Sequence, residues 1–158
     1  MLLTPHVMVG TAIAVAVSNP YIAVPLAFAS HFLGDLVPHW DFFSNTTSEE
    51  KTKGWRVLGV MADLTIGVGL GAMFTFFALW KLQNTPLALN IFLCGIASVL
   101  PDVLIGPYVY RTNGVNFLSY WAHKIQSKMQ FPAPLPWGIV SQIIVSLASF
   151  AVIANLVL

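Results

Sequence analysis

Long apolar runs alternate with short polar or proline-containing segments along most of the chain. The runs cover residues 3–17, 21–37, 57–80, 87–106 and 137–158. A helix that crosses the hydrocarbon core of a membrane needs about 20 apolar residues, so the first two runs are short and the last three are long enough. The pattern predicts one domain over residues 1–158, an all-α polytopic membrane bundle of about five transmembrane helices.

The stretch 107–136 has a different pattern. Its apolar residues recur at helical spacing, while Lys124, Gln126 and Lys128 face elsewhere. This arrangement is typical of a helix that lies in the membrane interface. The apolar stripe consists of Leu118, Trp121, Ala122, Ile125 and Met129.

Composition supports a membrane protein. Hydrophobic residues make up 57% of the chain and charged residues only 8%, whereas soluble domains carry about 25% charged residues. The net charge of +1 gives no reason to expect a nucleic-acid partner. The single cysteine, Cys94, excludes a disulfide framework and a cysteine-rich zinc site.

The basic residues predict the orientation. Lys51, Lys53 and Arg56 fall in one loop, and a second basic loop on the same side of a five-span bundle contains Arg111, Lys124 and Lys128, whereas Lys81 stands alone on the other side. Basic loops are usually cytoplasmic. We therefore expect a multi-pass protein of the cytoplasmic (inner) membrane, with its N-terminus inside and its C-terminus outside.

The acidic and histidine side chains gather near the cytoplasmic face in this topology. Ionisable residues at membrane depth are costly and usually functional. The set consists of His6, His31, Asp35, His39, Asp41, Asp63 and Asp102.

The densest part of this set lies at the end of the second run. His31 and Asp35 are four residues apart and share one helix face, and His39 continues the stripe if the helix extends past Pro38. A mixed set of imidazoles and carboxylates suits zinc, manganese or iron.

A short internal repeat relates the two predicted hairpins. His6 and Asp63 are each followed four residues later by a glycine, Gly10 and Gly67. Residues 37–39 (Val-Pro-His) close the first hairpin and residues 100–102 (Leu-Pro-Asp) close the second. Two pseudo-symmetric hairpins would place histidines opposite aspartates, which favours a centre with two metal ions over one.

Two resemblances follow from these motifs. Residues 31–35 (His-Phe-Leu-Gly-Asp), with Pro38 and His39, resemble a stretch of the zinc-dependent phospholipase C and single-strand nuclease superfamily, whose matching residues bind zinc. The whole chain is similar to the YdjM-like family of inner-membrane proteins, described as metal-dependent hydrolases. That resemblance rests on His-x-x-x-Gly from His6 and on Leu-Pro-Asp at Asp102.

Together these observations predict a metal-dependent hydrolase that cleaves a phosphoester of a lipid or lipid-linked substrate with a metal-activated water. The expected metal ligands are His6, His31, Asp35, His39 and Asp102. Asp63 or Asp41 would be the general base, and Arg111 and Lys124 would bind the phosphate.

Structural roles remain open for each of these residues. His31 and Asp35 could form a buried pair that only fixes helix packing, and Asp41 could cap a turn. Asp63 could pair with Arg56, and Asp102 with Arg111. The alternatives to a hydrolase are a structural or regulatory membrane protein and an ion- or proton-coupled transporter.

Overall fold

The computed structural model describes residues 1–42, 46, 53–110 and 116–157, and the side chains of Pro107 and Tyr110 are not among the described parts. The described chain is entirely helical apart from its connections, which confirms the predicted all-α class. The helices are α1 (Leu3–Ala16), α2 (Pro20–Asp35), α3 (Trp55–Phe76), which continues into a π-helical turn (Phe77–Lys81), α4 (Thr85–Tyr110), α5 (Phe117–Met129) and α6 (Trp137–Val157).

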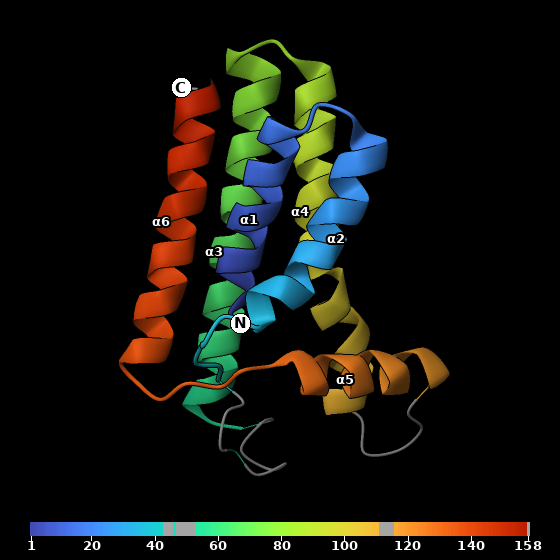
Figure 1. The fold of residues 1–158 in the computed structure, drawn as a ribbon, viewed down its shortest axis with the longest axis vertical. Helices are drawn as coiled ribbons and strands as arrows, with labels where there is room; N and C mark the ends of the chain where they lie inside the picture. The colour runs from blue at the N-terminus through green and yellow to red at the C-terminus, as the bar shows by residue number, and fades with distance from the viewer. Residues whose placement is uncertain (43–45, 47–52, 111–115, 158) are drawn as a thin grey trace.

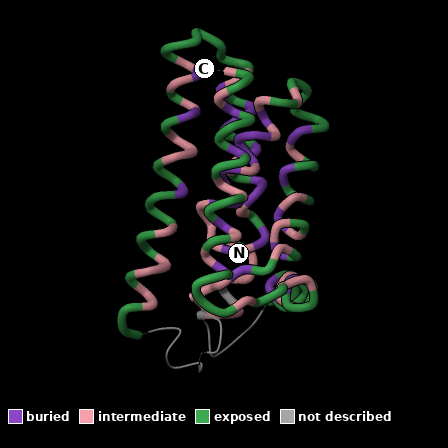
Figure 2. The backbone as a smooth tube through the Cα atoms, turned by 60° about the vertical axis from the view of Figure 1, so that its left-hand side comes forward, coloured by how far each residue is buried: buried purple, intermediate pink, exposed green. Residues whose placement is uncertain are grey.

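Helix α1 is the centre of the bundle, and it packs against α2, α3, α4 and α6 (Figure 1). It is apolar on all sides, as expected of a helix surrounded by others. Gly10 lets α1 approach α4 closely, since a Cβ at this position would lie 2.7 Å from the carbonyl oxygen of Cys94. Figure 2 shows buried positions toward the centre of the bundle and exposed ones along its outer helices.

Within the described residues, three helical stretches are long and apolar enough to cross a membrane: Trp55–Lys81, Thr85–Gly106 and Trp137–Val157. Their outward faces carry large exposed apolar side chains, such as Leu58 and Met73 on α3 and Leu147 on α6. Water would solvate this surface poorly, and lipid is the solvent that suits it. Helices α1 and α2 have 14 and 16 residues, about 21 and 24 Å at 1.5 Å per residue, less than the hydrocarbon thickness of about 30 Å.

Helix α5 lies across the base of the bundle and contacts α2 and α4 (Figure 1). The sequence correctly predicts its helical periodicity. Its apolar stripe faces away from the protein, because Leu118, Trp121 and Ile125 are all exposed, while Ser119 and Gln126 are buried. Ser119 and Gln126 therefore face the bundle, while Lys124 and Lys128 are exposed.

Two helix ends differ from the expectation. Helix α2 ends at Asp35, so His39 does not extend its stripe. Helix α4 continues beyond residue 106 to Tyr110, because proline disrupts the turn before it and does not oblige the helix to stop at its own position.

An extended pairing holds the segment after α2. The backbone N–H of His39 donates to the carbonyl of Phe131 at 3.0 Å, and the N–H of Ala133 donates to the carbonyl of His39 at 2.7 Å. Ser141 of α6 also donates to the carbonyl of Pro38. These contacts fix His39 beneath the helices without a helix of its own.

Candidate metal centre

The ends of α1, α2, α4 and α5 meet at the base of the bundle and form a buried cluster of polar side chains. His31 and Asp35 are fully buried, and His6, His39 and Gln126 are each at most 2% exposed. Asp102 is 26% exposed. We use the term buried cluster for these six residues: His6 (α1), His31 and Asp35 (α2), His39 (the following segment), Asp102 (α4) and Gln126 (α5).

Asp35 lies at the middle of the buried cluster. Its Oδ1 is 3.3 Å from His6 Nε2 and 4.0 Å from His39 Nε2, and its Oδ2 is 3.5 Å from His31 Nε2. The α-amino group of Met1 contacts Oδ1 directly. The rings of His6 and His31 stack with their centroids 4.0 Å apart. The i,i+4 pair predicted from the sequence is therefore joined by two further histidines.

Backbone carbonyls fix the tautomers of two histidines. His31 Nδ1 lies 2.8 Å from the carbonyl oxygen of Ser98, and His39 Nδ1 lies 2.8 Å from that of Val37. A carbonyl can only accept, so each Nδ1 carries the proton and donates. In the neutral rings, the lone pair of Nε2 then points toward the carboxylates. Histidines that bind metals are commonly held in this way.

Burial also favours the neutral form of His39. Removal from water lowers the pKa of its imidazole below the ordinary value, and the positive charge of the Met1 amine lowers it further. The hydrogen bond to Val37 and the carboxylate of Asp35 act in the opposite direction but are the weaker influences. A neutral imidazole is the form that binds a metal.

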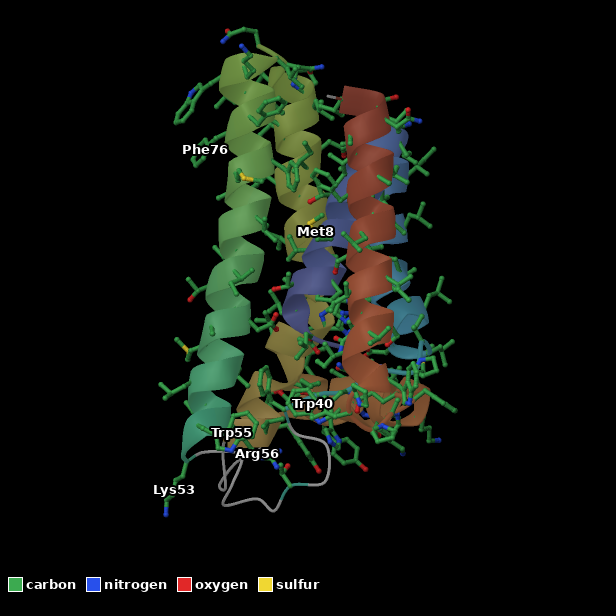
Figure 3. All side chains as sticks on the ribbon, turned by 90° about the vertical axis from the view of Figure 1, so that its left-hand side faces the viewer. Met8, Trp40, Lys53, Trp55, Arg56 and Phe76 are labelled. Atoms are coloured by element: carbon green, nitrogen blue, oxygen red, sulfur yellow. The ribbon has the colours of Figure 1, made fainter. Side chains whose placement is uncertain are left out.

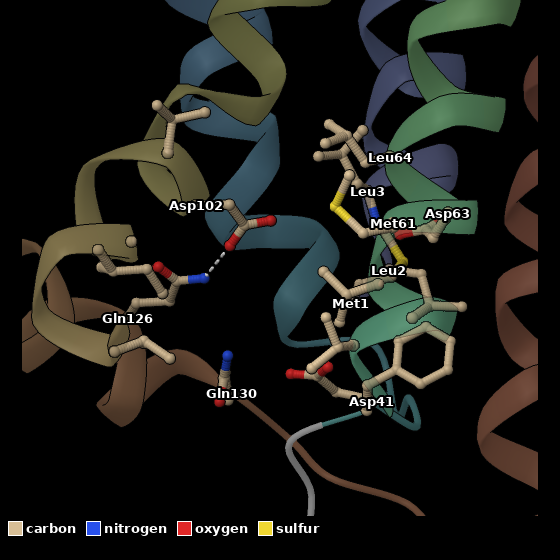
Figure 4. A pocket seen from close by; sticks show the side chains of 17 residues that line it. Met1, Leu2, Leu3, Asp41, Met61, Asp63, Leu64, Asp102, Gln126 and Gln130 are labelled. Atoms are coloured by element: carbon tan, nitrogen blue, oxygen red, sulfur yellow. Dashed lines mark hydrogen bonds between the residues drawn. The ribbon is translucent and has the colours of Figure 1, made fainter. Parts of the chain in front are cut away.

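Gln126 joins the buried cluster from α5, and the sequence analysis did not identify it. Its Nε2 donates to Asp102 Oδ1 at 2.6 Å (Figure 4) and lies 3.4 Å from Asp35 Oδ2 and 3.3 Å from His31 Nε2. An amide nitrogen has two hydrogens, so it cannot donate fully to three acceptors. Gln126 is thus surrounded by groups that would also attract a cation.

The separations in the buried cluster fit a metal site. Atoms bound to one zinc ion at about 2.1 Å in tetrahedral geometry lie about 3.4 Å apart. His31 Nε2 is 3.5 Å from Asp35 Oδ2 and 3.6 Å from Asp102 Oδ1, both too long for a good hydrogen bond. One ligand atom from each of His6, His31 and Asp102 lies within 4.8 Å of the others.

Among the described residues, two buried polar atoms of the cluster have no hydrogen-bond partner, His6 Nε2 and Gln126 Oε1. His6 Nε2 lies 3.3 Å from Asp35 Oδ1. Buried polar atoms are nearly always satisfied in native proteins. A cation bound between His6, His31 and Asp102 would give His6 Nε2 a partner.

Asp63 is on α3, and its side chain contacts the start of α1. Its Oδ2 accepts from the backbone N–H of Leu3 at 2.6 Å, and its Oδ1 accepts from that of Thr4 at 3.1 Å. The free N–H groups and the helix dipole at this end favour an anion. Both carboxylate oxygens are therefore engaged in fixing α1, which carries His6.

A cavity of about 410 Å³ adjoins the buried cluster and is lined by two of the other predicted site residues, Asp41 and Asp63. Asp41, Asp63 and Asp102 line it (Figure 4), together with Gln126 and Gln130. The remaining walls are mainly apolar: Met1, Leu2, Leu3, Phe42, Val57, Val60, Met61, Leu64, Val103, Ile105, Gly106 and Val109.

The two basic residues expected to bind substrate differ in what the structure shows of them. Lys124 is exposed on α5, and its Nζ lies 4.5 Å from the centre of the Trp121 ring and 5.9 Å from that of Tyr120. Arg111 lies outside the described residues.

Comparisons with models of protein families, with curated proteins and with solved structures find no match to this chain.

Proposed function

We propose that this protein is a metal-dependent hydrolase of the cytoplasmic membrane that cleaves a phosphoester of a lipid or lipid-linked substrate. The observation that carries the proposal is the buried His6–His31–Asp102 group, with its ligand atoms within 4.8 Å of one another. Asp35 lies between the histidines, and His6 Nε2 has no hydrogen-bond partner.

Charge supports a cation at this position. Two carboxylates, Asp35 and Asp102, share the buried cluster, and the amine of Met1 is the cation that contacts Asp35. If both carboxylates are ionised, one negative charge remains, and a buried charge without a partner is costly. A bound cation would offset this charge.

The ligand chemistry favours zinc, with manganese or iron as alternatives. Imidazole nitrogen and carboxylate oxygen are ligands that all three ions accept. The ligands we propose are His6, His31, Asp35 and Asp102, with His39 at the edge, where its Nε2 is 4.0 Å from Asp35. Whether the centre takes one ion or two, a bound ion supplies a water of lowered pKa.

Asp41 and Asp63 are the candidates for the general base among the carboxylates at the cavity. Asp63 uses both of its carboxylate oxygens to hold the first turn of α1. Asp41 lines the same cavity from the segment that carries His39. We further propose that Lys124 and Arg111 contact the phosphate from the membrane surface.

The proposed topology has five crossings, with the short helices α1 and α2 as the first two. Figures 1 and 3 support a common base: α5 and the labelled Lys53, Trp55 and Arg56 lie at the same end of the bundle. This basic end would face the cytoplasm. The buried cluster would then lie near the cytoplasmic surface, where a lipid headgroup can reach it.

The similarity to YdjM-like proteins fits this proposal in one physical respect. His6 and Gly10 lie on the same helix, and Gly10 permits the close contact between α1 and α4. Helix α4 carries both Ser98, which fixes the tautomer of His31, and Asp102. The glycine of the His-x-x-x-Gly motif therefore positions the histidine against the aspartate of Leu-Pro-Asp.

Hydrolysis of phosphatidic acid and other phospholipids in mixed micelles tests the function. The protein should carry its purification tag at the C-terminus, because the Met1 amine contacts Asp35. We expect zinc- or manganese-dependent release of product that a chelator abolishes. The His31→Ala, Asp35→Ala double variant should be inactive, and Lys128→Ala, which alters an exposed residue, should retain activity. Equal activity in the double variant would refute the proposal.

A packing role for the buried cluster is the second candidate. The hydrogen bond from Gln126 to Asp102 and the contact of the Met1 amine with Asp35 both exist without a metal. In this case a proton on His31 Nε2 would occupy the space between the carboxylates. The protein would then bind no metal and would be as stable in chelator as in zinc.

A further inference from the structure

A second cavity, of about 490 Å³, runs between α3 and α4 on the side of the bundle that would face lipid. Its walls are almost entirely apolar. It is lined by Leu3, Val7, Leu64, Gly67, Val68, Gly71, Ala72, Thr75, Phe76, Ile91, Phe92, Gly95, Ile96, Val99, Leu100 and Val103. We call it the α3–α4 groove.

The α3–α4 groove adjoins the cavity beside the buried cluster. Leu3, Leu64 and Val103 line both spaces. Figure 4 shows Leu3 and Leu64 at the side of the first cavity that is remote from Asp41. The cavity with three carboxylates and the apolar space between two helices of spanning length therefore share part of their walls.

Small residues on the walls of the groove leave open volume beside their Cα atoms. A Cβ added at Gly95 would meet no atom within 4 Å, and one at Gly71 would meet only Val7, at 3.3 Å. Gly95 is partly exposed on α4 and its neighbours in the groove, Ile91 and Val99, lie one turn away on either side. A larger side chain at position 95 would fill the groove without colliding with the backbone.

The groove is long enough to hold a hydrocarbon chain. Its lining on α3 extends from Leu64 to Phe76, about 18 Å at 1.5 Å per residue, within the hydrocarbon thickness of about 30 Å.

We infer that the α3–α4 groove binds one acyl chain of a glycerophospholipid from the leaflet on the side of the buried cluster, with its phosphate end in the cavity lined by Asp41 and Asp102. The acyl-chain site stands on the groove, whereas the placement of an anionic phosphate beside Asp41 and Asp102 requires the cation of the proposed function. The identification of this lipid as a substrate rests on the proposed function.

A helix from a second copy of the chain fits the groove less well. An α-helix with its side chains is about 10–12 Å across, wider than a hydrocarbon chain, and it carries no headgroup for the polar cavity at one end. A single hydrocarbon chain is narrow enough to enter, and the polar cavity at one end suits the headgroup that such a chain carries. Pockets for small molecules usually measure about 300–1,000 Å³.

Photo-crosslinking tests the inference. The protein would be reconstituted in phosphatidylethanolamine vesicles containing a phosphatidylglycerol with a diazirine near the end of one acyl chain, and labelled peptides would be identified by mass spectrometry. We expect labelling to concentrate on the groove residues of α3 and α4. Gly95→Trp should reduce this labelling at least five-fold.

Gly69→Trp is the matched control. Gly69 lies on α3, is exposed, and would meet no atom within 4 Å with a Cβ, but it does not line the groove. Labelling of the groove should be unchanged in this variant. Equal labelling of the outward face of α6, or an undiminished yield in Gly95→Trp, would overturn the inference, as would a cross-linked dimer through the groove.

Metal content separates this inference from the proposed function. Gly95→Trp should bind metal as the unaltered protein does, because position 95 lies outside the buried cluster. If labelling is not concentrated on the groove residues while metal binding persists, the acyl-chain site is refuted and the metal centre is not. If labelling succeeds in a protein that binds no metal, the lipid site stands without the hydrolase.

Discussion

Two buried polar sites lie along the same helices, α1 and α4, and they differ in how well their groups are satisfied. Near the end of α1, the Nδ2 of Asn90 donates to the carbonyls of Ala14 and Val17, both at 2.8 Å. At the start of α1, the contacts between histidine and aspartate span 3.3 to 4.0 Å, and His6 Nε2 has no hydrogen-bond partner.

The difference separates a structural polar contact from a binding site. Asn90 donates to backbone carbonyls at the end of α1 that have no partner within the helix. The donors of its amide are therefore satisfied within the protein. The buried cluster concentrates lone pairs and negative charge beyond what its own donors satisfy. An external cation is the simplest group that would complete it.

The largest expected effect is that of Asp35→Asn. This change keeps the shape of the side chain but removes the central negative charge, to which three histidines and the Met1 amine lie close. Metal affinity should fall more than about 100-fold, since even outer-shell partners are worth 10- to 100-fold. Isothermal titration with zinc measures it. An unchanged affinity would remove Asp35 from the ligand set.

Asn90→Ala, by contrast, should reduce stability without changing metal affinity. Loss of its two hydrogen bonds should lower the free energy of unfolding by about 1–3 kcal/mol, measured by denaturation in detergent. Its metal affinity should stay unchanged. A loss of metal in this variant would mean that the two sites are not independent.

Gln126 offers a graded test at the edge of the cluster. Gln126→Leu should weaken metal binding about 10- to 100-fold, as expected for a residue that orients ligands, because Asp102 loses its donor. Gln126→Glu should strengthen binding of a divalent ion by adding a carboxylate. Weaker zinc binding by Gln126→Glu than by Gln126→Leu would contradict this account.

The smallest effect concerns pH and the metal-free protein. Burial lowers the pKa of His39 in the folded state below its ordinary value, about 6.5 in the unfolded chain. Unfolding then takes up a proton below about pH 6.5, so stability should decrease as the pH falls through that value. His39→Gln should reduce this dependence, as followed by denaturation in chelator between pH 5 and 8. An unchanged pH dependence would show that other groups cause it.

The periodicity of the sequence predicts the helices well because apolar runs and turn residues are local signals. The runs at 57–80 and 137–158 correspond closely to α3 with its π-helical turn and to α6. The i,i+4 relation of His31 and Asp35 is likewise a property of one helix, and the structure brings their side chains to 3.5 Å.

What the sequence could not predict depends on contacts between distant segments. Gln126 is a common kind of surface residue, and its burial arises only because α5 turns Ser119 and Gln126 to the bundle and its apolar stripe outward. Asp63 holds the backbone of a helix 59 residues earlier in the chain, measured to Thr4. Hydrophobic patterns carry no signal for either contact.

The decisive measurement is equilibrium zinc binding to the C-terminally tagged protein, to the His31→Ala, Asp35→Ala variant and to Asn90→Ala. We expect one or two tightly bound ions in the unaltered protein and in Asn90→Ala, and none in the double variant. Absence of bound zinc, manganese and iron from the folded, unaltered protein after reconstitution would contradict it and leave the buried cluster a packing element.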